Sequence, residues 1–365
     1  MAKIAIIGAG ELGKALCKLI MVTSDHEILC VDTDITACAD LEDECDTLRR
    51  PKFQELMYPS PPIEILHSES HTVTKNAVKN FAPEVIVCAN ESLEDAADIA
   101  FSLDLHCVSF SEDHEAVLKI QKNETSKTFV LQTGLAPGLL NYFAIDVLNE
   151  QLDTKMLTMA CGSLPDVVLG DSALTRTKNI ESVLREHLQP ALILEDGAER
   201  YLDPLTDVAS LRVSGVEYET FIAGSGIGEP SAYDVPNVCY RNIAFPGHLS
   251  AILSKLEDND DPVSGLAEAF QPITDDYVIM AVIAEDVFGR LKTSYMSFGS
   301  CTEPGLQMSA QTFASVCTAA GVIQLILEEQ LPAGHLNADQ ISLSDLEQTA
   351  AMAVFDRSLM YAGRK

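Results

Sequence analysis

Residues 8–13 of the chain read Gly8-Ala9-Gly10-Glu11-Leu12-Gly13, a G-x-G-x-x-G string. The string follows an apolar run at residues 3–7 and opens a segment, residues 11–22, whose apolar side chains recur with helical spacing. Between a strand and a helix, such a string predicts a turn that binds a dinucleotide. Gly8 permits the tight turn, Gly10 lets the pyrophosphate approach the backbone, and Gly13 lets the helix pack closely on the strand.

A carboxylate stands where such a turn needs one. Asp32 follows the next predicted strand, residues 27–31, about 20 residues after the glycines, and Thr33 comes directly after it. An acid at this place bonds the hydroxyls of the adenine ribose and repels a 2′-phosphate, and no Lys or Arg stands near it. We therefore predict NAD as the cofactor, with NADP disfavoured. FAD and S-adenosylmethionine also use glycine strings, and the motifs described below decide against them.

Strand and helix patterns alternate over residues 1–135, which predicts a doubly wound α/β sheet of the Rossmann type as the first domain. Six strands are predicted, at residues 3–7, 27–31, 63–66, 84–89, 106–110 and 128–132. Helices are predicted between them, the clearest at residues 11–22 and 93–103.

The pattern changes after residue 135. Residues 136–305 predict a second, inserted α+β domain, with a helix at residues 139–149. Its strands are predicted at residues 156–161, 191–194, 218–221, 278–284 and 292–298. Residues 306–365 predict helices that return to the first domain, at residues 313–330 and 343–361. The second of these opens with the capping box Ser344-Asp345-Leu346-Glu347.

The most specific string in the chain is Thr133-Gly134-Leu135-Ala136-Pro137-Gly138-Leu139-Leu140-Asn141. It forms a strand-to-helix turn at the carboxyl edge of the predicted sheet, where ligands of such sheets bind. This string resembles the G-x-A-P-G-x-x-N signature of the saccharopine dehydrogenase-like family, and within it the lysine 6-dehydrogenases. Three later segments are similar to motifs of that family in the same order: residues 161–165, 190–197 and 245–248.

The resemblance implies hydride transfer between a nicotinamide and the carbon of a C–N bond in an amino acid or related amine. It implies the two-domain fold predicted above, in which the inserted domain, residues 136–305, binds substrate and forms the contact of a homodimer. It assigns further cofactor contacts to the residues after two strands, Cys88, Ala89, Asn90, Ala136 and Pro137, beside Glu11 and Leu12 of the glycine turn. It assigns substrate contacts to Gly138, Asn141 and Gly162.

A C–N hydride transfer also requires one proton to be managed and, for an amino acid, a cation that binds the carboxylate. His248 and Asp166 lie in motif-like turns and are the candidates for the proton. A hydrogen-bonded structural histidine is the competing interpretation of His248. Spacing does not distinguish the four arginines Arg176, Arg185, Arg212 and Arg241, and we take Arg241 as the candidate for the carboxylate.

The chain departs from the family pattern at Ala244, Cys88, Ser109 and Ser163. Ala244 and Ser163 lie in the predicted substrate domain, and we interpret the cofactor half as better kept than the substrate half. The departures motivate a second hypothesis, a non-catalytic NAD-binding sensor or partner protein of the same fold.

The composition restricts which partners, metal sites and cellular location we expect for the protein. The 365 residues carry a net charge of −31, which disfavours nucleic acid and anionic membrane surfaces as partners and attracts cationic substrates. The 10 cysteines form no CxxC and no zinc spacing, so they are predicted to be buried thiols in a reducing compartment, with no metal site. No targeting segment or apolar run of about 18 residues is apparent, and we expect a cytoplasmic protein.

Overall fold

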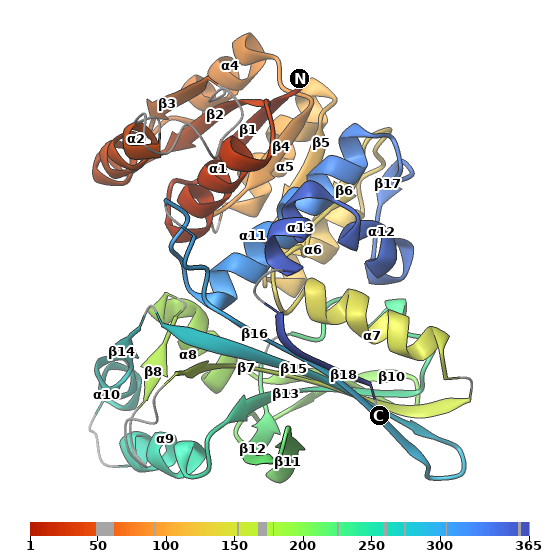
Figure 1. Cartoon of the computed structure of the whole chain (residues 1–365). Coiled ribbons are helices and arrows are strands. Elements are labelled where there is room, and N and C mark those ends of the chain that lie inside the picture. Colours follow the sequence, from red (N-terminus) through yellow and green to blue (C-terminus); the bar gives the residue numbers. More distant parts are fainter. Residues whose placement is uncertain are drawn as a thin grey trace. The chain divides into compact units, whose positions relative to one another are not determined.

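The computed structural model describes residues 1–48, 62–90, 92–151, 153–166, 174–177, 179–224, 226–257, 261–273, 275–303, 305–356 and 359–364. These residues form two compact units (Figure 1). The first contains Met1–Leu135, Thr302–Gln307 and Thr312–Arg357, and the second contains Ala136–Cys301, Met308–Gln311 and Ser358–Lys365.

The first unit is built on a parallel sheet with the strand order β17-β6-β5-β4-β1-β2-β3. Its central strands are buried on both faces, which is why they read as continuous apolar runs; in β1, Ile4, Ala5 and Ile6 are fully buried. The strands are β1 (Lys3–Ile7), β2 (Glu27–Asp32), β3 (Ile63–His67), β4 (Val85–Cys88), β5 (His106–Ser109), β6 (Thr128–Val130) and β17 (Gly334–His335).

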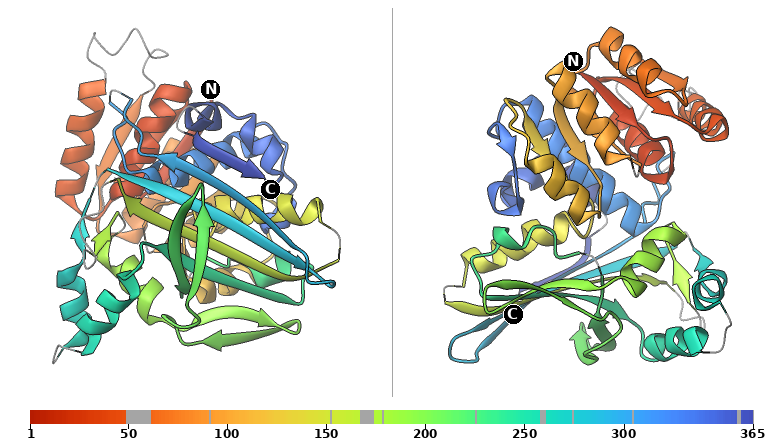
Figure 2. Two further views of the ribbon diagram at one scale, coloured as in Figure 1. Left: turned by 60° about the horizontal axis from the view of Figure 1, so that its bottom comes forward. Right: turned by 180° about the vertical axis from the view of Figure 1, so that it is seen from behind.

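Helices cover both faces of this sheet (Figures 1 and 2). Polar side chains cap several of them: Ser70 accepts from the Val73 amide at the start of α4, and Asp113 accepts from Ala116 at the start of α6. The helices are α1 (Glu11–Thr23), α2 (Ile35–Leu48), α4 (His71–Phe81), α5 (Leu93–Leu103), α6 (His114–Gln121), α11 (Ala310–Leu327), α12 (Leu343–Glu347) and α13 (Ala350–Phe355), with a 3-10 turn at Ala338–Gln340.

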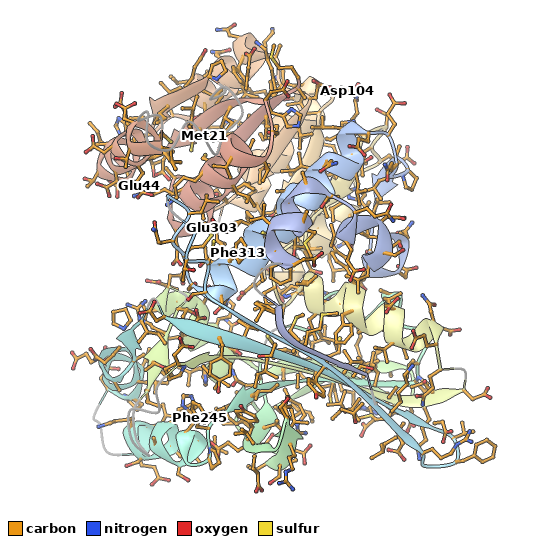
Figure 3. All side chains as sticks on the ribbon, viewed as in Figure 1. Met21, Glu44, Asp104, Phe245, Glu303 and Phe313 are labelled. Carbon is orange, nitrogen blue, oxygen red and sulfur yellow. The ribbon has the colours of Figure 1, made fainter. Side chains whose placement is uncertain are left out.

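Apolar side chains of α1 and α11 fill the core on one side of the sheet. Met21 and Phe313 lie inside the first unit, whereas Asp104 points away from it (Figure 3). The Phe313 ring packs on Phe355 of α13, with 5.7 Å between the ring centroids. Segments distant in sequence therefore share one core.

The second unit contains a mixed sheet with the order β10-β9-β13-β7-β15-β16-β18, to which β12 and β11 add beside β13. β7 pairs in parallel with β13 and antiparallel with β15. The strands are β7 (Thr154–Pro165), β9 (Ala191–Glu195), β10 (Ala198–Leu202), β11 (Ala209–Val213), β12 (Val216–Ile222), β13 (Asn237–Ala244), β15 (Asp276–Asp286), β16 (Leu291–Gly299) and β18 (Leu359–Arg364). β8 (Thr175–Arg176) and β14 (Gln271–Pro272) form a separate pair.

In the described part of the second unit, four helices pack on the sheet. α7 lies against β7 and β15, and the other three enclose an apolar cluster around Phe221 of β12 with Val183, Ile252 and Leu266. The helices are α7 (Leu139–Asn149), α8 (Ile180–Leu188), α9 (His248–Glu257) and α10 (Pro262–Ala269), with a 3-10 turn at Pro230–Ala232. The predicted fold class, a doubly wound α/β unit with a second α+β unit, is confirmed.

The predicted C-terminal helix at residues 343–361 is wrong. Two side chains cap separate short helices there: Ser342, not Ser344, caps α12, and Thr349 accepts from the Met352 amide to start α13. After α13 the chain forms β18, which pairs antiparallel with β16 in the second unit. The last strand therefore belongs to the second sheet, and only the helices before it return to the first unit.

One described helix is long and apolar enough to cross a membrane, which the apolar runs did not lead us to expect. It is α11, Ala310–Leu327, and 83% of its length is buried inside the structure. Burial of this extent is typical of the core helix of a globular protein. The ten cysteines are likewise buried, and none forms a disulfide.

Candidate functional site

The glycine turn of the first unit joins the ends of β1, β2 and β4. The Gly8 amide donates to the carbonyl of Val31 at 2.8 Å, and the Ala89 amide donates to the carbonyl of Ile7 at 2.8 Å. Since β1, β2 and β4 are parallel neighbours, their carboxyl ends meet at one edge of the sheet. α1 begins directly after Gly10, so the positive end of its dipole also lies at this edge.

The three glycines have different surroundings. Gly8 has φ +112°, in the region that favours glycine, and a Cβ there would lie 2.9 Å from the carbonyl carbon of Ala89. A Cβ on Gly13 would collide with the carbonyl oxygen of Gly8. A Cβ on Gly10 would meet no atom within 4 Å. Gly8 and Gly13 are thus required by the fold, whereas Gly10 borders open space that a ligand can approach.

Asp32 is held against this turn by both carboxylate oxygens. Oδ2 accepts from the Ala9 amide, and Oδ1 accepts from the Asp34 amide at 2.7 Å. Among the described residues no Lys or Arg pairs with it. The neighbouring Thr33 is exposed, and its carbonyl oxygen lies 3.0 Å from Nε2 of His67. An uncompensated carboxylate fixed beside a glycine turn is suited to accept hydroxyl hydrogen bonds and to repel a phosphate.

Glu11 and Leu12 form the first turn of α1. Glu11 is exposed, and its Oε1 accepts from the Thr312 hydroxyl of α11. Leu12 is half-buried. The contact directs the Glu11 carboxylate toward α11.

At the end of β4, Cys88 and Asn90 contact each other. The Cys88 thiol is buried, and its Sγ lies 3.3 Å from the Asn90 carbonyl oxygen and 3.4 Å from Asn90 Oδ1. Burial raises the pKa of Cys88 to about 11, so the thiol stays protonated and unreactive. Ala89 is half-buried and Asn90 is exposed. Asn90 Oδ1 also accepts from the Ser92 amide at 3.0 Å, which shapes the turn before α5.

In the second unit, Ala136 and Pro137 are buried and joined by a cis peptide bond. Gly138 follows with φ +138° and starts α7. The Gly138 amide donates to Oδ1 of Asn141 at 2.6 Å.

The side-chain amide of Asn141 forms its hydrogen bonds with other groups of the protein. The side chain is buried, and the two N–H groups of Nδ2 have three acceptors in reach: the carbonyl of Ile227 at 2.9 Å, that of Gly226 at 3.1 Å and the Tyr233 hydroxyl. It ties the start of α7 to the loop before β13. We therefore do not retain Asn141 as a direct substrate ligand and assign it a positioning role.

The guanidinium group of Arg241 also forms its hydrogen bonds within the protein. Its Nε donates to Thr220 Oγ1 at 3.0 Å, Nη1 donates to Asp207 Oδ2 at 2.6 Å, and Nη2 donates to the carbonyls of Asp207 and Thr220. The residue is 7% exposed. The guanidinium clamps the loop before β11 onto β12, so Arg241 is withdrawn as the candidate for a substrate carboxylate.

Gly162 is a packing position. A Cβ there would collide with the carbonyl oxygen of Ile243 on β13. The glycine lets β7 and β13 approach closely.

His248 begins α9 among aromatic rings. Its ring lies 6.5 Å from Phe221 in a stacked arrangement, 6.1 Å from Phe270 and 6.3 Å from His187, measured between centroids. Burial, with a smaller effect of His187, lowers the pKa of His248 from 6.5 to about 4. The ring of His248 is therefore neutral at neutral pH. Asp166, the other candidate for the proton, is exposed just after β7.

A buried polar network near the start of α11 was missed by the sequence analysis. Asp276 is fully buried, with Oδ2 accepting from Ser163 Oγ at 2.7 Å and Oδ1 accepting from the Ala310 amide. Ser163 Oγ also lies 2.9 Å from Thr177 Oγ1. Burial raises the pKa of Asp276, and these hydrogen bonds oppose the rise. The one sequence signal was Ser163, which stands where the family motif has glycine.

The comparisons with known proteins bear on the fold. No family model and no curated protein matches the chain. An apo saccharopine dehydrogenase (L-Glu forming) from Saccharomyces cerevisiae superposes with a TM-score of 0.70 at 12% identity, covering 100% of this chain and 99% of that one. A homospermidine synthase from Legionella pneumophila, solved with NAD, gives 0.69 at 13%, covering 100% and 91%. The chain therefore has the saccharopine dehydrogenase fold over its whole length.

The glycine turn yields a paired prediction. Gly13→Ala should lower the free energy of unfolding by about 2 kcal/mol or more, because the new methyl meets the Gly8 carbonyl. Gly10→Ala should cost less than about 1 kcal/mol, because its methyl points into open space. Urea denaturation of the two variants checks this. Equal losses would contradict the assignment of Gly10 to a ligand-facing position.

His248 yields a prediction on pH. Because its pKa is about 4 in the folded protein and 6.5 ordinarily, the unfolded chain binds this proton first. The stability that the neutral His248 ring confers is therefore fully present above about pH 6.5. As the pH falls toward 4, the free energy of unfolding decreases by up to roughly 3 kcal/mol. His248→Phe should flatten this part of the stability profile. Urea denaturation at several values between pH 7 and pH 4 measures it, and parallel profiles for variant and wild type would contradict the prediction.

Proposed function

We propose that the chain is an NAD-dependent oxidoreductase that acts on the C–N bond of an amine or imine. The observation that carries the proposal is the carboxylate of Asp32, fixed by the Ala9 and Asp34 amides beside the open face of Gly10. The whole-chain likeness to a saccharopine dehydrogenase and to a homospermidine synthase solved with NAD supports the reaction class.

The residues of the first unit fit the two halves of the cofactor. The amides of the first turn of α1 and the positive end of its dipole suit the pyrophosphate, and the open face of Gly10 gives it access. Asp32 suits the adenine ribose, and its charge disfavours a 2′-phosphate. When bound, NAD supplies the hydride acceptor. The protein orients it, excludes water and manages one proton.

The substrate class follows from charge. Arg241 is clamped on Asp207, so this arginine does not supply a site for a substrate carboxylate. The net charge of −31 attracts cations. Among lysine deamination, saccharopine-type condensation and polyamine-type condensation, these features favour a substrate whose charge is dominated by ammonium groups. The exposed carboxylate of Asp166 is retained as the candidate for the proton, since the half-buried ring of His248, with its pKa lowered to about 4, is a weak base.

The affinities of the protein for NAD and for NADP test the proposal that NAD is the cofactor. Calorimetry should show NAD binding at least about tenfold tighter than NADP binding, because Asp32 repels the extra phosphate. Asp32→Ser should weaken NAD binding and reduce or reverse the preference. Gly10→Ala should weaken both nucleotides about tenfold, because its methyl enters the space of the pyrophosphate. Absence of binding by either nucleotide would refute the proposal.

A panel of amines then tests the reaction. Reduction of NAD at 340 nm in the presence of lysine, diamines or polyamines would support an amine dehydrogenase, and NADH oxidation with an amine plus a carbonyl compound would support a reductive condensation. The internal use of Asn141 and Arg241 also favours a second candidate, a non-catalytic NAD-binding protein. Tight NAD binding without turnover over the whole panel would select that candidate.

A further inference from the structure

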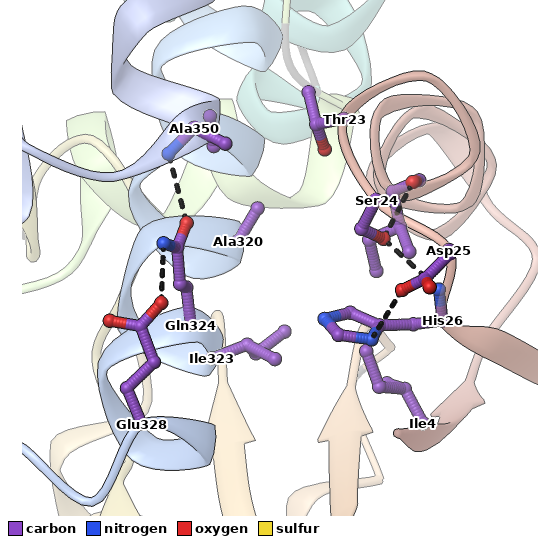
Figure 4. Close-up of a pocket in the computed structure, with 12 residues that line it drawn as sticks. Ile4, Thr23, Ser24, Asp25, His26, Ala320, Ile323, Gln324, Glu328 and Ala350 are labelled. Carbon is purple, nitrogen blue, oxygen red and sulfur yellow. Dashed lines mark hydrogen bonds and ion pairs between the residues drawn. The ribbon is translucent and has the colours of Figure 1, made fainter. Parts of the chain in front are cut away.

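A cavity of about 310 Å³ opens in the first unit between the end of α1 and the second half of α11 (Figure 4). Its floor is apolar and includes Ile4, Ile20 and Ile323. Its rim is polar: Asp25 and His26 lie on one side, and Gln324 and Glu328 lie on the other. The volume is that of about ten water molecules, which is enough for a small ligand.

The cavity lies at the opposite edge of the sheet from the glycine turn. Ile4 lies near the start of β1, and His26 directly precedes β2. α1 runs from the glycine turn to the cavity over 13 residues, which is about 20 Å. A ligand in this cavity therefore leaves Gly10 and Asp32 untouched, and the site is separate from the proposed cofactor site.

The electrostatics of the cavity favour a cation. α1 and α11 both end beside it, at Thr23 and Leu327, and neither has a basic residue in its last turn. The C-terminal end of a helix is negative and is stabilised by positive charge. Among the residues that the structure describes, no Lys or Arg lines the cavity.

The two carboxylates at the rim differ: among the described residues Glu328 forms no ion pair, whereas Asp25 lies within ion-pair distance of the charged amino terminus. The oxygens of Glu328 accept from the side-chain amides of Gln324 and Gln330, each at 2.8 Å, and these donors carry no charge. Asp25 Oδ1 lies 3.9 Å from His26 Nδ1 and 4.0 Å from the amino group of Met1.

His26 adds little positive charge to the rim. Its Nδ1 accepts the Ala2 amide at 3.2 Å, which requires that nitrogen to be unprotonated. Burial lowers the pKa of this histidine.

We propose that this cavity is a binding site for a small aliphatic amine. The ammonium group lies beside the Glu328 carboxylate, next to the negative end of α11, and the methylene chain lies on the isoleucine floor. An ammonium fits because it donates several hydrogen bonds to carboxylate and carbonyl oxygens. The apolar floor selects an organic cation over a hydrated metal ion.

Calorimetric titration of the NAD-free protein with n-butylamine, 1,4-diaminobutane and the neutral analogue 1-butanol tests the proposal. Both amines should bind, and 1-butanol should bind at least about fivefold more weakly. Glu328→Gln should weaken amine binding about fivefold. Glu329→Gln, which makes the same charge change at the next residue outside the lining, should leave it unchanged. Ala320→Leu should abolish binding by filling the cavity.

Two controls accompany the titrations. Thermal unfolding of every variant shows that the fold is retained, and the affinity for NAD should be the same in Glu328→Gln as in wild type. Absence of amine binding, equal binding of 1-butanol, or amine binding that is insensitive to both Glu328→Gln and Ala320→Leu would overturn the proposal. Because the titration needs no cofactor and no turnover, its outcome is independent of the proposed oxidoreductase activity.

Discussion

The first unit depends on the close approach of α1 to the turn that follows β1. Only a residue without a Cβ fits at Gly13, because the carbonyl oxygen of Gly8 occupies that space. This contact lets the helix begin directly at the strand end. The Gly8 amide then reaches Val31, and the Ala9 amide reaches Asp32. One backbone constraint thus brings the ends of β1 and β2, the start of α1 and the Asp32 carboxylate to one place.

In the second unit, buried polar residues hold the structure together. Asn141 connects α7 to the loop before β13, Arg241 connects β13 to Asp207, and Asp276 connects Ser163 to the start of α11. A buried amide, guanidinium or carboxylate left without partners would cost stability, so each of these groups is satisfied within the protein. Residue types that suggest ligand binding in a motif thereby serve the fold.

The excess of acidic over basic residues is also apparent around the cavity at the ends of α1 and α11. α1 and α11 end without basic residues, and their ends share a cavity with Asp25 and Glu328. A Lys or Arg in the last turn stabilises the negative end of a helix. At the end of α1 the hydroxyls of Thr23 and Ser24 donate instead to the carbonyls of Leu19 and Ile20, so these carbonyls are satisfied without a positive charge.

The sequence by itself determined the doubly wound sheet, the glycine turn and the place of Asp32, because these depend on local spacing: apolar runs of strand length, glycines at fixed intervals and one acid after β2. Only the tertiary structure decided which groups the side chains of Asn141, Arg241 and His248 contact. Their partners Ile227, Asp207 and Phe221 lie on other elements, so no local pattern reveals them. The same holds at the C-terminus, where helical periodicity favoured a continuous helix but pairing with β16 made residues 359–364 a strand. A side chain in a motif is available to a ligand only when the folded chain has not already used its hydrogen bonds.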